Sequence, residues 1–289
     1  MLYYNPKSFD EALKQIDSLK DKDVVILAGG TDVVPKLNAR PERSGYFDKP
    51  LVALENKAVV SLNDSGMNYI KDKKSEIAVG AMTTMSQLLD SPIIDKVPVL
   101  KEALNVLAGL TIRNVATVGG NIMNASPAAD SVPALIALDA SVVLASIDSE
   151  RTLKLSELFV APGKTSCKGN EILKEVIIPV REGKCNFIKF GRRKAESLSI
   201  VNGAAYANME SGICKNVVIA LGAVAPTPLR VEAAERIMEG NIVTEKLIAE
   251  AADVAADVVK PIDDKRSSGD YRKKLVKVLV KRALTKVCC

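Results

Sequence analysis

Two glycine pairs carry the clearest chemical signal in this chain. The first, Gly29-Gly30, follows the apolar run 24–28 and precedes Thr31-Asp32, while the second, Gly119-Gly120, lies inside the longer segment 111–130. Glycine has no Cβ, so the neighbouring backbone N–H groups stay uncovered, and such a surface suits an anionic oxygen. Two such turns in one chain indicate that a single ligand contacts both of them.

The residue inventory excludes several other kinds of site. The chain has no histidine, so it has neither a Ser-His-Asp nor a Cys-His catalytic site. No two of its five cysteines are spaced C-x-x-C, which argues against a zinc knuckle or an iron–sulfur cluster and favours reduced thiols. We therefore predict no catalytic side chain and no metal site.

Two nucleotide-binding signatures are also missing. The segment Gly163-Lys164-Thr165 is similar to the end of a P-loop, but Leu158 stands where that motif requires glycine. No G-x-G-x-x-G occurs, so the fingerprint of a Rossmann dinucleotide fold is absent.

The elements that must position the glycine pairs follow from hydrophobic periodicity and helix-start signals. Ser8 and Glu11 form a capping box that opens a helix. The first unit, residues 1–56, is predicted to contain this helix at 8–20 and strands at 24–28 and 51–54. A central unit, residues 57–179, is predicted to contain strands at 68–71, 76–79, 141–147 and 172–178, helices at 83–89, 99–107 and 132–138, and the long glycine segment as a loop.

The last third of the chain has a different character. Strands near 186–190, 201–208 and 217–222 precede helices near 231–239, 244–258 and 270–286, which indicates a separate sheet-plus-helices domain at 180–289. A length of 289 residues favours two domains, with three small ones as the alternative. The fold class is predicted to be α+β.

Charge and hydropathy bear on partners and location. The net charge of +5 comes largely from basic residues on the outer face of the final helix, which we interpret as a solvated face. With no Trp and few Phe or Tyr residues, the chain lacks stacking residues for a nucleic-acid platform. No apolar run approaches the roughly 20 residues of a membrane helix, and residues 1–6 do not look like a secretory signal. We expect no nucleic-acid or membrane partner and a cytoplasmic location.

The two glycine segments together resemble the FAD-binding subunit of the molybdenum hydroxylases, the family of xanthine dehydrogenase and carbon monoxide dehydrogenase. Its first loop reads approximately A-G-G-T-[DE], as in Ala28 to Asp32 here. Its second reads approximately [IV]-R-N-x-[AG]-[ST]-[IVL]-G-G-N, as in Ile112 to Asn121, followed nine residues later by an acid, which is Asp130 in this chain.

The resemblance implies FAD as cofactor and an FAD-binding fold of two α/β subdomains with a C-terminal sheet-plus-helices domain. By position in the motifs, it implies that FAD contacts Ile26, Leu27, Ala28, Gly29, Gly30, Thr31, Asp32, Val33, Leu107, Thr117, Val118, Gly119, Gly120, Asn121, Asp130, Leu173 and Lys189. Asp130 also stands where it would cap a helix starting near Ser131, and both roles are compatible. Leu107, Leu173 and Lys189 equally fit ordinary packing.

The resemblance further implies an electron-transfer role. The subunit would take electrons from a partner subunit with [2Fe–2S] clusters, which receives them from a molybdopterin-binding subunit, and would pass them to NAD or another acceptor. One alternative is a stand-alone FAD-dependent oxidase or reductase with its own substrate pocket. Another is a non-catalytic scaffold that has lost its cofactor, against which the intact glycine pairs and Asp130 argue.

Overall fold

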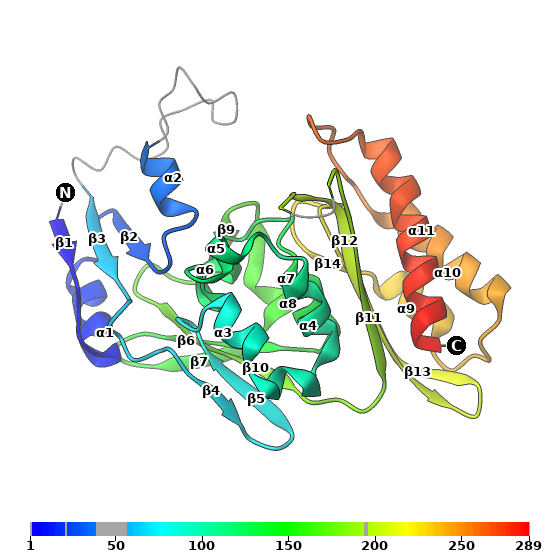
Figure 1. The fold of residues 1–289 in the computed structure, drawn as a ribbon, viewed down its shortest axis with the longest axis horizontal. Helices are drawn as coiled ribbons and strands as arrows, with labels where there is room; N and C mark the ends of the chain where they lie inside the picture. Colours follow the sequence, from blue (N-terminus) through cyan, green and yellow to red (C-terminus); the bar gives the residue numbers. More distant parts are fainter. Residues whose placement is uncertain (1, 21, 39–56, 194–195, 289) are drawn as a thin grey trace.

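The structure is a computed structural model that describes residues 2–20, 22–38, 57–193 and 196–288. Three main sheets succeed one another along the molecule, and the C-terminal helices cover the far side of the third (Figure 1). The strand predicted at 51–54 lies outside the described residues. The mixture of helices and sheets confirms the α+β class.

The N-terminal sheet is parallel, with strand order β1-β3-β2. Helix α1 packs beside it and begins as predicted, because the Ser8 hydroxyl accepts a hydrogen bond from the N–H of Glu11. The middle strand, β3, begins at Ala58 and so lies after residue 56, where the sequence predicted the first unit to end. These elements are β1 (Leu2–Tyr4), α1 (Phe9–Ser18), β2 (Val24–Leu27), α2 (Val33–Asn38) and β3 (Ala58–Ser61).

The central sheet is antiparallel, with strand order β4-β5-β10-β6-β7. Sequence analysis found most of it but missed β7, which alternates exposed and half-buried residues at the sheet edge. The strands are β4 (Ile70–Asp72), β5 (Glu76–Gly80), β6 (Ser141–Ala145), β7 (Glu150–Lys154) and β10 (Ile172–Pro179). The surrounding elements are α3 (Met85–Asp90), η2 (Pro92–Lys96), α4 (Pro98–Asn105), α7 (Ser131–Ala137), α8 (Leu155–Leu158), β8 (Phe159–Ala161) and β9 (Lys164–Thr165).

The long glycine segment is helical over two short stretches, so the prediction of a loop was wrong. These are α5 (Leu110–Arg113) and α6 (Val118–Met123). Helix α6 starts at Val118, directly before the glycine pair, because the Thr117 hydroxyl accepts a hydrogen bond from the Gly120 N–H at 3.0 Å and caps the helix. Glycine lowers helix stability by about 1 kcal/mol relative to alanine, which made the pair look like a loop.

The third sheet has both faces covered. Helices α4 and α7 pack on the face toward the central domain, and the C-terminal helices cover the other (Figure 1). The side chains of β12 alternate accordingly: Ala204 and Tyr206 join the central core, while Ala205 and Ala207 join the C-terminal core. The elements are β11 (Lys184–Gly191), β12 (Ser199–Glu210), β13 (Ile213–Gly222), β14 (Leu229–Arg230), α9 (Glu232–Met238), α10 (Glu245–Val258) and α11 (Gly269–Cys288).

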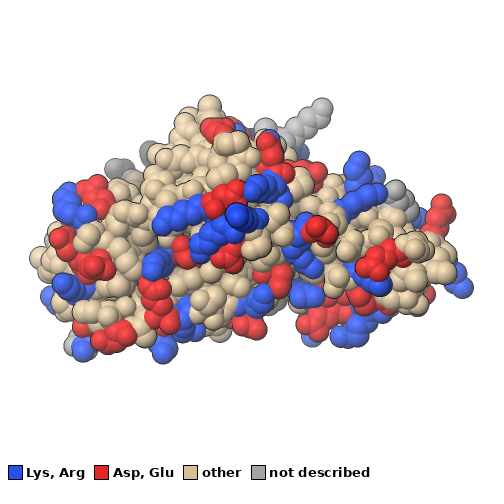
Figure 2. All heavy atoms as spheres, turned by 90° about the horizontal axis from the view of Figure 1, so that it is seen from below, with Lys and Arg blue, Asp and Glu red and all other residues tan. Residues whose placement is uncertain are grey.

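Charged side chains of both signs are interspersed over the face seen in Figure 2, in keeping with the modest net charge. No helix within the described residues is long and apolar enough to cross a membrane.

One cation lies inside the C-terminal domain. Arg272, on α11, is 2% exposed and donates to the carbonyl oxygens of Ile200 at 2.7 Å and Ala223 at 3.0 Å. Its Nη2 lies 2.8 Å from a carboxylate oxygen of Asp264. Burial alone would raise the pKa of Asp264, but hydrogen bonds from Arg266 and the charges of Arg266 and Arg272 lower that pKa to about 2. Arg272 therefore ties α11 to the ends of β12 and β13.

Replacing Arg272 with methionine should lower the free energy of unfolding by about 3–5 kcal/mol, because two carbonyls lose their donor and Asp264 loses a counter-charge. Urea denaturation of the purified chain measures the change. The control is Lys273→Met at the exposed neighbouring position, which should leave the unfolding midpoint in place. Equal midpoints for the two variants would show that the buried cation does not stabilise the fold.

Candidate functional site

The two glycine segments lie directly against each other. A Cβ on Gly29 would lie only 1.7 Å from the carbonyl oxygen of Val115, and a Cβ on Gly120 would lie 3.6 Å from the Cβ of Ala28. The end of β2 therefore packs, backbone on backbone, against the link between α5 and α6. This contact joins the N-terminal sheet to the central domain.

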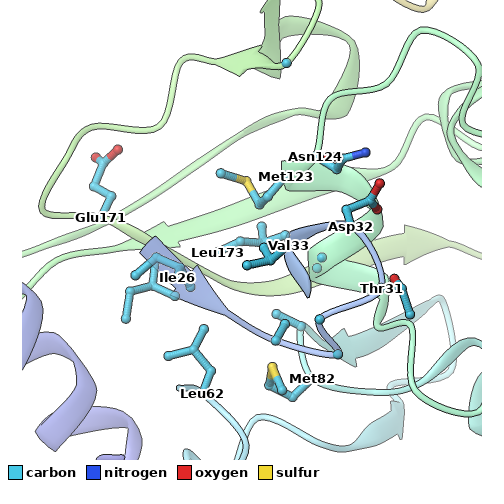
Figure 3. A pocket seen from close by; sticks show the side chains of 18 residues that line it. Ile26, Thr31, Asp32, Val33, Leu62, Met82, Met123, Asn124, Glu171 and Leu173 are labelled. Carbon is cyan, nitrogen blue, oxygen red and sulfur yellow. The ribbon is translucent and has the colours of Figure 1, made fainter. Parts of the chain in front are cut away.

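A cleft of about 380 Å³ opens beside this contact (Figure 3), within the range of about 300–1,000 Å³ that is typical of ligand pockets. It brings together residues from both glycine segments and from β10. Ten of the predicted cofactor residues line it, namely Ile26, Ala28, Gly29, Gly30, Thr31, Asp32, Val33, Gly119, Gly120 and Leu173.

Sequence reasoning missed eight lining residues: Leu62, Ala81, Met82, Met123, Asn124, Gly163, Glu171 and Ile172. For two of them a signal existed. Met123 and Asn124 lie three and four residues after Gly120, so a helical interpretation of the segment would have placed them on the same face. No motif marks the other six, which reach the cleft through the tertiary fold.

Of the two glycine pairs, only the first has backbone donors without an acceptor in the part of the chain that the structure describes. Among the described residues, the N–H groups of Gly29 to Val33 have no acceptor. Gly30 has φ +73°, a left-handed conformation that favours glycine. The N–H groups of the turn formed by Gly29 to Val33 can therefore donate hydrogen bonds to a bound anion.

At the second glycine pair the prediction of uncovered N–H groups was wrong. The N–H of Gly119 donates to the Ala81 carbonyl at 2.8 Å, and that of Gly120 donates to the Thr117 hydroxyl. The N–H of Asn121 donates to the Thr117 carbonyl. Gly119 instead permits close packing, because a Cβ there would lie 2.6 Å from the Cβ of Ala81. The second segment thus forms a wall of the cleft.

None of the described lining residues of the cleft is lysine or arginine, so an anion bound there would meet backbone donors and no basic side chain of the lining. Its two acids are Asp32 and Glu171. The carboxylate of Glu171 accepts hydrogen bonds from Nε of Arg151 at 2.7 Å and from the Lys168 N–H at 2.7 Å. The bond from Arg151 holds the pKa of Glu171 below its usual value although burial opposes it. Glu171 therefore remains ionised and is neutralised by Arg151.

Three other predicted residues form a second cluster, outside the cleft. Lys189 Nζ donates to the Asp130 carboxylate at 2.7 Å and to the carbonyl of Val106 at 2.9 Å, next to buried Leu107. The side chains of Lys189 and Asp130 are only 11% and 9% exposed. This pair joins α7 of the central domain to β11 of the C-terminal domain.

Asp130 does not cap α7 with its side chain, contrary to that part of the sequence analysis. Its carboxylate has other donors: Ser199 Oγ at 2.5 Å and Asn202 Nδ2 at 2.7 Å, in addition to Lys189. Three donors from the C-terminal domain thus outcompete the local N–H groups of the helix start.

Helix α6 lies between the cleft and this cluster. Its glycines line the cleft, whereas the Asn121 side chain accepts a hydrogen bond from the Ser131 hydroxyl at 2.6 Å, beside Asp130. Of the remaining predicted residues, Thr117 caps α6, Val118 is buried, and Leu27 offers its carbonyl to Leu62 in the N-terminal sheet. A ligand that contacts both the cleft and the cluster must be long.

Comparison with known proteins decides what this ligand is. The profile of the FAD binding domain in molybdopterin dehydrogenase matches residues 1–181. The profile of the CO dehydrogenase flavoprotein C-terminal domain matches residues 186–287. The chain belongs to this family of molybdenum hydroxylase flavoproteins.

Individual relatives are similar in sequence to this chain along most of its length. The nicotinate dehydrogenase FAD-subunit of Eubacterium barkeri is 30% identical over 287 residues, which cover 97% of this chain and 93% of that one. The xanthine dehydrogenase FAD-binding subunit of Escherichia coli O157:H7 is 31% identical over 268 residues, 90% of this chain and 87% of that one. Carbon monoxide dehydrogenase from Hydrogenophaga pseudoflava has a chain of the same fold, with a TM-score of 0.90, 30% identity, and 99% and 96% of the two chains covered.

This flavoprotein is therefore an oxidoreductase subunit with FAD as its cofactor. The residues present fit such a group. FAD carries a diphosphate, for which the N–H groups of Gly29 to Val33 are suited, because they have no acceptor in the described part of the chain.

Alanine at Gly29 or Gly119 should lower the free energy of unfolding by about 1–3 kcal/mol, because the added Cβ meets backbone or a neighbouring Cβ in a packed contact. Chemical denaturation of the FAD-free chain measures this. Gly169→Ala is the control, since a Cβ there meets nothing within 4 Å. If all three variants unfold at the same denaturant concentration, the backbone contacts do not hold the two segments together.

Proposed function

We propose that this flavoprotein is the FAD-carrying electron-transfer subunit of a molybdenum hydroxylase complex. The observation that carries the proposal is that Gly29 to Val33, whose N–H groups have no acceptor among the described residues, line a cleft together with Gly119 and Gly120 of the second glycine segment. Backbone N–H donors can stabilise a bound diphosphate by hydrogen bonds without basic side chains. This suits a cleft whose described lining residues include no lysine or arginine.

The proposed contacts divide between the two ends of FAD. Residues 26–33 would hold the diphosphate and adenosine portion, and residues 117–121 would form the opposite wall. Leu107, Asp130, Leu173 and Lys189 would lie toward the flavin end. The proposed domain division is 1–56, 57–179 and 180–289, with FAD between the first two. Because β3 (Ala58–Ser61) pairs with β1 and β2, the first unit extends to Ser61.

The proposed electron path follows from the partners of the relatives. Electrons would arrive from a [2Fe–2S] subunit, which receives them from a molybdopterin-binding subunit, and would leave to NAD or another acceptor. A flavin accepts single electrons and releases a pair, so the protein's part is to position and tune it. This requires no titrating side chain, in agreement with the absence of histidine. The complex would work in the cytoplasm.

The chemistry at the proposed flavin end of the site argues against a stand-alone oxidase. Such an enzyme needs an acid or base beside the flavin to act on its substrate. The acid and the base proposed to lie toward the flavin, Asp130 and Lys189, are paired with each other, and Asp130 also accepts hydrogen bonds from Ser199 and Asn202.

Replacing Val33 with proline should weaken FAD binding about 10- to 100-fold, because it removes one N–H donor to a charged ligand. Val33 is the first residue of α2, a position where proline is tolerated, so the fold should persist. Fluorescence titration of the FAD-free chain with FAD measures the affinity. Glu245→Pro makes the same change at the start of α10 and should leave binding intact. Equal affinity in both variants would place the diphosphate elsewhere.

A second experiment tests the electron path. Under anaerobic conditions, NADH should bleach the flavin of the FAD-loaded chain, since transfer between flavin and NAD is reversible. Candidate substrates such as nicotinate or xanthine should bleach it only after the partner subunits are added. Bleaching by such a substrate with the chain alone would favour the stand-alone oxidase, and failure of NADH would show that another acceptor is used.

A further inference from the structure

Two cysteines distant in sequence lie together at the far end of the C-terminal domain. Cys214 is at the start of β13, and Cys288 is in the last turn of α11. Their sulfur atoms are 3.5 Å apart, and the residues are 0% and 8% exposed. Both are reduced thiols in the structure.

The backbone around the pair is held in place. The N–H of Cys214 donates to the Asn241 carbonyl at 3.0 Å, and its carbonyl accepts from the Gly240 N–H at 2.8 Å. Cys288 lies in the regular turn of a helix whose preceding residue, Val287, is fully buried. A disulfide has an S–S length of about 2.05 Å, so small side-chain rotations would bring the sulfurs to bonding distance.

The thiols differ from the other described cysteines in chemical environment. The hydrogen bond with Cys288 lowers the pKa of Cys214 below its usual value, although burial opposes the effect. Burial raises the pKa of Cys167, to about 11, and also that of Cys185. Since the thiolate is the reactive form, Cys214 is more reactive than Cys167 and Cys185 once an oxidant reaches it.

We propose that Cys214 and Cys288 are an oxidation site, at which hydrogen peroxide converts the two thiols to a reversible disulfide. The S–S bond forms while both S–H bonds and the peroxide O–O bond break. Two electrons and two protons pass from the thiols to the peroxide oxygens, which leave as two molecules of water. A dithiol reductant reverses the reaction by thiol–disulfide exchange.

The disulfide fastens the end of α11 to β13. The opposite end of the same helix is already held by Arg272 on the carbonyls of Ile200 and Ala223. With both ends fixed, α11 cannot leave the sheet it covers without carrying β13 with it. The cross-link also closes a long loop of chain, which restricts the unfolded state.

The test uses the full FAD-loaded chain with Cys289→Ser, so that only one thiol remains on the C-terminal tryptic peptide. Trypsin cuts after Lys215 and Lys286 and so separates the two sulfurs. After treatment with peroxide and alkylation, mass spectrometry should find the peptides of Cys214 and Cys288 joined, with the loss of two hydrogen atoms. The melting temperature should rise by roughly 5–10 °C and return after addition of dithiothreitol.

Cys214→Ser and Cys288→Ser, each in the same background, should show neither the joined peptide nor the rise. Cys185→Ser is the matched control and should behave like the parent chain. The proposal is overturned if both sulfurs are recovered alkylated after peroxide treatment. It is equally overturned if the joined peptide forms but the melting temperature does not move.

Discussion

The structure depends on one close contact, in which the backbone of Gly29 lies against the carbonyl of Val115. Because a Cβ at this position would overlap that oxygen, only glycine lets the end of β2 reach the link between α5 and α6. Gly119 permits a similar approach of α6 to Ala81. These contacts bring the two glycine segments together where Gly29, Gly30, Gly119 and Gly120 line the cleft. The two glycine pairs thus have different roles. The first pair supplies N–H donors, and both pairs allow the close packing that a Cβ would prevent.

Buried polar groups add directed bonds to the apolar contact between the central and C-terminal domains. Asp130, at the start of α7, receives hydrogen bonds from Lys189, Ser199 and Asn202, all of which belong to the third sheet. A buried carboxylate is tolerated only with such partners. On the other side of that sheet, Arg272 fixes the covering helix. The candidate flavin end of the site therefore lies at a junction whose geometry is specified by directed bonds.

Much of this architecture could be predicted from local signals. Ser8 and Glu11 marked the start of α1, the strands predicted near 186–190, 201–208 and 217–222 correspond to β11, β12 and β13, and the paired glycines marked both walls of the cleft. The predictions that were wrong concerned residues whose contacts lie far away in the sequence. The helical state of the second glycine segment rests on the Thr117 cap and on the approach to Ala81, which lies on another element. The donors to Asp130 lie 59 to 72 residues downstream, beyond the reach of any capping rule. Leu62 and Met82 reach the cleft only through sheet pairing and packing.

The central claim is that FAD is held by backbone donors of the first glycine segment and not by those of the second. Amide hydrogen–deuterium exchange, compared with and without FAD, tests it most directly. The account predicts that exchange at Gly29 to Val33 slows strongly when FAD binds, because those N–H groups have no acceptor in the described part of the protein. Exchange at Gly119 to Asn121, whose N–H groups are already bonded within the protein, should change much less. Unchanged exchange at Gly29 to Val33 in the FAD-saturated protein would contradict the account.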